Sequence, residues 1–168
     1  MSHEQAAAVP LAALTAWQAL VDTAGVHAGQ RVLVHAAAGG VGHFAVQFAK
    51  HLGTHVIATA SSARHEWLKE LGADEVIDYT AVRFEDIARE VDVVIDLVGD
   101  AHDKTGSRSL EVLRQDDSPP DPSVRVAPHN HIRKPDHPFA WTALGVVRSR
   151  VPVQDPGADG TGVVVVRS

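Results

Sequence analysis

The chain has 168 residues, a length that allows about one ordinary domain. Hydrophobic residues make up 45% and charged residues 21%, which excludes collagen, a coiled coil and a wholly disordered chain. The formal net charge of −6 argues against a basic nucleic-acid-binding face. Cysteine is absent, which excludes disulfides, a catalytic thiol and a thiolate zinc site.

Neither a membrane span nor a secretory signal is visible in the sequence. No apolar run approaches the ~18 residues of a membrane-spanning helix. The first residues are polar and then alanine-rich, without a basic segment before an apolar one. The sequence therefore predicts a soluble cytoplasmic protein.

Up to about residue 115, apolar residues alternate between helical spacing and short continuous runs. Glycines stand where helices are expected to end, and serine stands where one is expected to begin. In chain order, the pattern predicts helices at 12–21, 41–52, 62–71 and 82–89, and strands at 31–35, 55–59, 75–79 and 91–98. This alternation, with strongly apolar strands, predicts an α/β fold: a Rossmann-like, doubly wound parallel sheet with helices on both faces, here incomplete.

The composition changes sharply near Gln115. Eight of the nine prolines lie at or after Pro119, and the formal charge is −6 before the change and zero after it. We therefore divide the chain into a dinucleotide-binding domain at 1–115 and an irregular, poorly ordered tail at 116–168. Within the tail, the valines of 162–166 favour a strand at the edge of a sheet.

A glycine-rich turn joins the first strand to the helix that follows it. The run Ala37-Ala38-Gly39-Gly40-Val41-Gly42 has the position and spacing of a dinucleotide-binding turn, with alanine in place of the first glycine. Small residues let the backbone approach a pyrophosphate, and the helix N-terminus attracts the negative charge. A tight turn without a ligand is the alternative.

The end of the second strand indicates which cofactor fits. NAD-binding sites place a carboxylate there to hold the ribose 2′-hydroxyl. This chain has Thr59 to Arg64 instead, with two serines, an arginine and no carboxylate. Hydroxyl groups and an arginine can donate hydrogen bonds to a 2′-phosphate, so the stretch favours NADP. Alternatively, Ser61 and Ser62 cap a helix and Arg64 is a solvated surface charge.

Several motifs in the same order resemble the medium-chain dehydrogenase/reductase superfamily. The segment 7–20 resembles the entry to that family's nucleotide-binding domain, and the cofactor loop at 34–42 is similar to that of its zinc-independent branch, the quinone oxidoreductases and enoyl reductases. The segments 71–79, 91–99 and 109–114 resemble the family's next two strands and the helix that follows. The likeness covers about residues 6–114.

The resemblance implies NADPH-dependent hydride transfer to a quinone or an activated C=C bond in a small-molecule substrate. No catalytic residue is assigned, and no metal site is expected, because the histidines at 129, 131 and 137 have no visible scaffold. A homodimer is an option that the sequence leaves open. By position, the resemblance implies these cofactor-binding residues: Ala38, Gly39, Gly40, Val41, Gly42, Ser61, Arg64, Tyr79, Asp96 and Val98. For Tyr79 the alternative is packing at a strand end, and for Asp96 it is a turn or capping role.

The chain departs from the family pattern at both ends of the likeness. The family's substrate-binding domain precedes the segment that matches, and a fifth strand follows the helix at 109–114. We therefore expect a truncated or frame-shifted product with little reductase activity alone. The alternative to a reductase function is a dinucleotide-binding module without catalysis. A methyltransferase using S-adenosylmethionine is disfavoured because it usually has an acidic residue at the second strand end.

Overall fold

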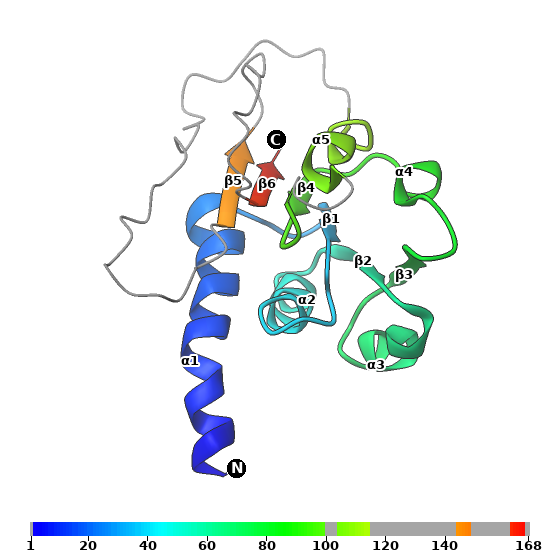
Figure 1. Cartoon of the computed structure of the whole chain (residues 1–168). Coiled ribbons are helices and arrows are strands. Elements are labelled where there is room, and N and C mark those ends of the chain that lie inside the picture. The colour runs from blue at the N-terminus through cyan, green and yellow to red at the C-terminus, as the bar shows by residue number, and fades with distance from the viewer. Residues whose placement is uncertain (1, 100–103, 115–143, 149–161, 167–168) are drawn as a thin grey trace.

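The computed structural model describes residues 2–99, 104–114, 144–148 and 162–166 of the chain (Figure 1). Its centre is one sheet with the strand order β3-β2-β1-β4-β6-β5. The first four strands in the chain are β1 (Arg31–Val34), β2 (His55–Ala60), β3 (Glu75–Asp78) and β4 (Val93–Ile95). They are all parallel. The order places β1 between β2 and β4, so the chain crosses from one half of the sheet to the other after β3.

Helices alternate with these strands, as the sequence predicts. They are α1 (His3–Trp17), α2 (Gly42–His51), α3 (His65–Glu70), α4 (Phe84–Ile87) and α5 (Thr105–Ser109), with a π-helical segment η1 at Gln18–Thr23 and a 3₁₀ turn η2 at Ser62–Arg64. The parallel sheet and the covering helices confirm the Rossmann-like α/β fold. The elements at the domain's ends differ most from expectation: α1 begins nine residues earlier than predicted, and the helix expected at 109–114 ends at Ser109.

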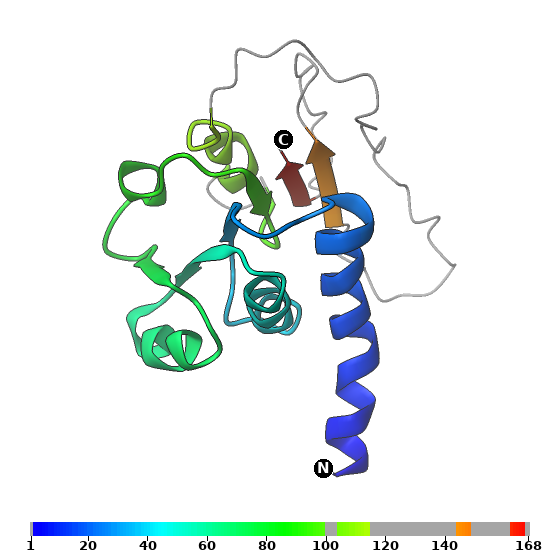
Figure 2. The same ribbon diagram turned by 180° about the vertical axis from the view of Figure 1, so that it is seen from behind.

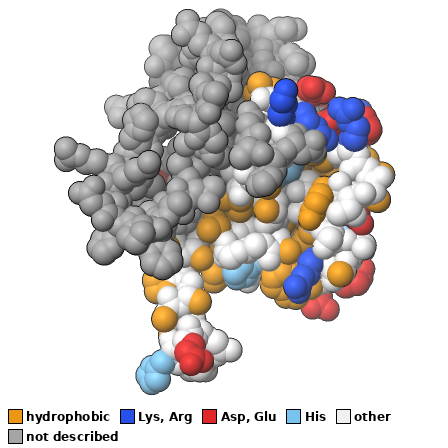
Figure 3. Space-filling model, in the orientation of Figure 1, with side chains coloured by type: hydrophobic (Ala, Val, Ile, Leu, Met, Phe, Trp, Pro, Cys, Tyr) orange, Lys and Arg blue, Asp and Glu red, His pale blue; other side chains and the backbone are white. Residues whose placement is uncertain are grey.

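The early start of α1 has a local cause. Ser2 accepts a hydrogen bond from the backbone N–H of Gln5, and the Gln5 side chain accepts one from the backbone N–H of Ser2. This reciprocal cap begins a helix ahead of any apolar periodicity. Helix α1 lies beside α2 and extends past the sheet (Figures 1 and 2). Hydrophobic side chains of α1 are exposed, among them Leu11 and Leu14. Figure 3 shows hydrophobic side chains along the protruding helix.

Side chains from alternate strand positions pack on opposite faces of the sheet, because successive residues of a strand point to opposite sides. On one face, Val32, Val34, Val56 and Ala58 form a core with buried residues of α1 and α2. On the other face, Leu33, Ile57 and Val94 pack with Phe84 and the segment after α5. One core therefore covers each face of the sheet. This is expected, because strands that are apolar at almost every position must be buried on both faces.

Two segments of the proline-rich region are strands of the same sheet. They are β5 (Leu144–Arg148) and β6 (Gly162–Val166). Strand β6 pairs antiparallel with β4 and parallel with β5. The prediction of a strand at 162–166 is confirmed, but its position at the sheet edge is wrong, because β6 lies between β4 and β5. The expectation of an irregular tail otherwise falls on residues outside the described ones. Within the described parts, no helix has the length and apolar character needed to cross a membrane.

Candidate cofactor-binding site

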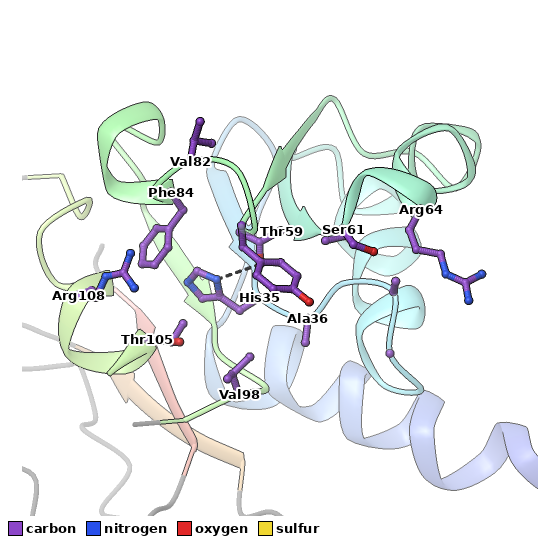
Figure 4. A pocket seen from close by; sticks show the side chains of 14 residues that line it. His35, Ala36, Thr59, Ser61, Arg64, Val82, Phe84, Val98, Thr105 and Arg108 are labelled. Carbon is purple, nitrogen blue, oxygen red and sulfur yellow. Dashed lines mark hydrogen bonds between the residues drawn. The ribbon is translucent and has the colours of Figure 1, made fainter. Parts of the chain in front are cut away.

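A cavity of about 490 Å³ opens at the C-terminal ends of the first strands (Figure 4). Open parallel sheets bind ligands at this edge, beside the point where the strand order reverses. Here the reversal lies between β1 and β4. The cavity is lined by His35, Ala36, Ala38, Gly39, Thr59, Ala60, Ser61, Arg64, Tyr79, Val82, Phe84, Val98, Thr105 and Arg108.

The turn between β1 and α2 is tight, and the space around the missing Cβ differs from one of its glycines to the next. Ala36 adopts a left-handed φ of 48°, and its carbonyl accepts the N–H of Gly39 at 2.9 Å. A Cβ on Gly42 would lie 2.7 Å from Ala37 Cα, so Gly42 allows α2 to approach the end of β1. A Cβ on Gly39 would lie 3.1 Å from the Ala36 oxygen, whereas one on Gly40 would meet nothing within 4 Å. Gly40 therefore borders open space.

The N-terminus of α2 follows the turn that lines the cavity. Its cap residue, Val41, gives no side-chain hydrogen bond to the helix end. The N–H groups of a first helical turn have no intrahelical acceptors and carry partial positive charge. Gly39 and Ala38 bring this end of the helix to the cavity wall, while Gly40, Val41 and Gly42 of the predicted set are not among the lining residues.

Three more of the predicted residues line the cavity. Ser61 and Arg64 come from the turn after β2, and Tyr79, which is 60% exposed, follows β3. Asp78, the carboxylate nearest in sequence, is not a lining residue: its Oδ1 accepts from the Thr80 N–H at 2.9 Å and the Thr80 hydroxyl at 2.6 Å. These bonds lower the pKa of Asp78. No Asp or Glu occurs among the described lining residues.

The structure places Asp96 and Val98 differently. Val98 lines the cavity, whereas Asp96 is buried behind it. Asp96 Oδ1 accepts hydrogen bonds from the backbone N–H groups of Val98 at 2.9 Å and Gly99 at 3.1 Å. The aspartate thereby closes the turn that follows β4.

The floor of the cavity contains polar residues that sequence reasoning missed. His35 Nδ1 lies 3.1 Å from Thr59 Oγ1, and His35 Nε2 lies 3.0 Å from Ser109 Oγ. The Ser109 hydroxyl donates to the Thr105 carbonyl at 2.6 Å. A signal was available in the sequence: His35 and Thr59 each follow an apolar strand residue two positions earlier, Leu33 and Ile57, so polar groups end an otherwise apolar face.

His35 stays neutral in this setting. Its side chain is fully buried, and burial lowers its pKa from 6.5 to about 3, with the nearby charge of Arg108 lowering it further and that of Glu85 opposing. Its ring also makes an edge contact with Phe84, with centroids 4.5 Å apart. A buried neutral imidazole carries a single ring proton, either on Nδ1 or on Nε2.

An ion pair between Arg108 of α5 and Glu85 of α4 fixes one wall of the cavity. Arg108 donates from Nε and from Nη2 to the two carboxylate oxygens of Glu85, at 2.8 and 2.6 Å, and stacks over Phe84 at 4.9 Å. These hydrogen bonds lower the pKa of Glu85 to about 2. Arg83 also binds Glu85. Figure 4 shows Arg108 and Arg64 at opposite ends of the cavity, with His35, Thr59 and Ser61 between them.

The sheet and the cavity at its edge are of the Rossmann type. Comparisons with known proteins show what the chain resembles. Residues 40–117 match the family model described as zinc-binding dehydrogenase. The solved quinone oxidoreductase from Coxiella burnetii is 50% identical, with a TM-score of 0.63 over 68% of this chain and 35% of that one. Over about two thirds of its length, the chain is similar to the quinone-oxidoreductase-like branch of the medium-chain dehydrogenase/reductase superfamily.

Other relatives include reductases and polyketide synthases. The chain is 43% identical to 2-methylene-furan-3-one reductase from Solanum lycopersicum, over 68% of this chain and 29% of that protein. It is 45% identical to polyketide synthase GfsB from Streptomyces halstedii, over 77% of this chain and 2% of that protein. The structure of CurK enoyl reductase is 39% identical, with a TM-score of 0.60 over 67% of this chain and 35% of that one. The chain thus spans about a third or less of the length of these relatives.

Proposed function

We propose that the chain is the cofactor-binding domain of an NADP(H)-dependent oxidoreductase of the quinone reductase or enoyl reductase type. The observation that carries the proposal is the cavity beside the glycine turn, with Arg64 and Ser61 at its rim and no carboxylate among its described lining residues. A 2′-phosphate needs cationic and hydroxyl partners and is repelled by a carboxylate. The similarity to a quinone oxidoreductase, an enoyl reductase and 2-methylene-furan-3-one reductase supports the assignment to the oxidoreductases.

The residues present fit a dinucleotide. The pyrophosphate would lie on the N-terminus of α2, where Gly40 borders open space and Gly42 keeps the helix against β1. The 2′-phosphate would lie at Ser61 and Arg64, with Tyr79 beside them. The adenosine would fill the cavity between the apolar side chains of Val82 and Val98. When bound, the nicotinamide supplies hydride, and the protein supplies binding and orientation.

We expect Arg64→Ala to weaken NADPH binding by ~1–3 kcal/mol and to leave NADH binding nearly unchanged, because only NADPH offers a phosphate to the guanidinium. Fluorescence titration of both reduced cofactors measures the difference. Arg64→Lys is the matched control, since it keeps the charge and should lose less. Equal affinities of the unmodified chain for the two cofactors would contradict the NADP assignment.

The second candidate function, a dinucleotide-binding module without catalysis, applies to the 168 residues by themselves. The relatives with solved structures are about three times as long as the matched part, which covers 35% of the quinone oxidoreductase. Hydride transfer needs donor and acceptor held ~3–3.5 Å apart, and domain interfaces commonly supply that confinement. We propose that this chain alone binds cofactor but reduces substrate slowly.

The purified chain is therefore expected to oxidise NADPH with quinones and enones at close to the uncatalysed rate. The measurement is the loss of NADPH absorbance across a substrate panel, with and without protein. Free NADPH mixed with each substrate gives the background. Turnover at rates typical of enzymes would show that the residues present complete an active site.

Four further features belong to the same proposal. Among the residues that the structure describes, no group of three His, Asp or Glu side chains is arranged to hold a metal. We propose a reaction that does not use zinc, because the sequence resembles the zinc-independent branch. The proposed substrate is a small quinone or enoyl compound. We propose a cytoplasmic location and keep a homodimer as the assembly to be tested.

A further inference from the structure

The hydrogen bonds at the cavity floor have a direction that the heavy atoms determine. Ser109 has one hydroxyl proton, and it is donated to the Thr105 carbonyl at 2.6 Å. Ser109 Oγ can therefore only accept from His35 Nε2, which lies 3.0 Å away. His35 Nε2 must carry a proton.

The proton on His35 in turn determines the direction of the hydrogen bond to Thr59. His35 is neutral near pH 7 because burial and the charge of Arg108 disfavour its protonated form, with Glu85 the opposing charge. A neutral ring with its proton on Nε2 has a bare Nδ1, which accepts a hydrogen bond. The partner at 3.1 Å is Thr59 Oγ1, so the threonine hydroxyl proton is committed to His35.

Thr59 is thereby left with lone pairs and no proton to offer. It lines the cavity between His35 and Ser61 (Figure 4), and His35 is its side-chain hydrogen-bond partner among the described residues. We propose that His35 is a positioning residue that makes Thr59 an obligate hydrogen-bond acceptor, so that the cavity selects a nucleoside presenting a donor at that point. The inference rests on the proposed nucleotide function.

Two groups of an adenosine 2′-phosphate can provide that donor. One is the 6-amino group of adenine, and the other is the ribose 3′-hydroxyl, since the 2′-oxygen carries the phosphate. Each would meet the lone pair of Thr59 Oγ1. A carbonyl oxygen in the same place would face another acceptor, and a buried acceptor pair without a proton between them is unfavourable.

The first test compares ligands that differ in this donor. We expect the chain to bind NADPH about tenfold more tightly than its hypoxanthine analogue, in which a 6-oxo group replaces the amino group, if adenine is the donor. If the ribose is the donor, 3′-deoxyadenosine 5′-monophosphate should compete with NADPH about tenfold less well than adenosine 5′-monophosphate, while inosine 5′-monophosphate competes equally. Calorimetry or fluorescence competition gives the affinities.

The second test uses variants and reads the ratio of two affinities, which a merely structural role does not change. Thr59→Ser keeps the hydroxyl and should keep the discrimination, whereas Thr59→Val should lose it. His35→Phe frees the threonine proton to rotate toward a ligand acceptor, so the ratio should approach one. Ser109 still donates to Thr105 in that variant. If His35→Phe does not fold, the two Thr59 variants decide.

Equal binding of both members of each ligand pair by the unmodified chain would overturn this inference while leaving the proposed function intact. Failure of the unmodified chain to bind NADPH at all would overturn the proposed function itself. Retained discrimination in a folded His35→Phe or Thr59→Val chain would also overturn the assignment of His35 and Thr59.

Discussion

Replacing Gly42 by alanine is expected to destabilise the domain by about 3 kcal/mol. The added Cβ would lie 2.7 Å from Ala37 Cα and 2.8 Å from the Ala37 carbonyl carbon, both backbone atoms. Backbone at the end of a buried strand cannot move aside as a flexible side chain does, so α2 must shift away from β1. The gain in helix propensity, at most ~1 kcal/mol, offsets only part of this cost.

Urea unfolding measures this effect, and Gly40→Ala is its control. A Cβ at Gly40 meets nothing within 4 Å, so the free energy of unfolding should change by less than ~0.5 kcal/mol. The same variant should nevertheless bind NADPH more weakly, because the open space beside Gly40 is where the pyrophosphate would approach. Unchanged stability of Gly42→Ala would show that this turn does not require glycine for packing.

The folded chain is expected to lose stability on mild acidification because of His35. Its pKa is 6.5 when unperturbed and about 3 in the fold. Between these values the unfolded chain binds one more proton at this residue than the folded chain does, so acid favours unfolding. The free energy of unfolding should fall by about 2 kcal/mol from about pH 7.5 to about pH 5, and by about 4 kcal/mol by about pH 3.

Denaturant unfolding at several pH values above about 5 isolates this residue from the carboxylates. Glu85, with an ordinary pKa of 4.5 and about 2 in the fold, adds a loss in the same direction only at lower pH. His35→Gln, which hydrogen-bonds without titrating, should be less stable than the unmodified chain at neutral pH and should lose much of the pH dependence. An equally steep dependence in that variant would assign the acid sensitivity to other groups.

The parts of the fold that the sequence predicts are those that local pattern controls. The four parallel strands and the helices between them follow from apolar periodicity, and the glycine turn follows from its spacing. The partners of β6 could not be predicted, because pairing with β4 and β5 depends on long-range contacts that a run of valines does not specify.

The candidate site divides in the same way. Ala38, Gly39, Ser61 and Arg64 are predicted from motifs and Tyr79 and Val98 from the family resemblance, and all six line one cavity. His35, Phe84 and Arg108 were missed because they belong to segments far apart in the chain: the bond from His35 to Ser109 joins residues 74 positions apart. No motif spacing connects them, and only the packing of α4 and α5 over one face of the sheet brings them together.

Thr59 and Ala60 are neighbours at the end of β2 but belong to opposite faces of the sheet. Ala60 packs in the core shared with α1 and α2, whereas Thr59 bonds to His35 on the face covered by α4. Strand alternation thus separates two positions that both line the cavity. A substitution at Ala60 therefore changes the lining of the cavity without disturbing the bond between Thr59 and His35, and a substitution at Thr59 leaves the packing of Ala60 in its core intact. The two lining positions can be varied independently, one residue at a time.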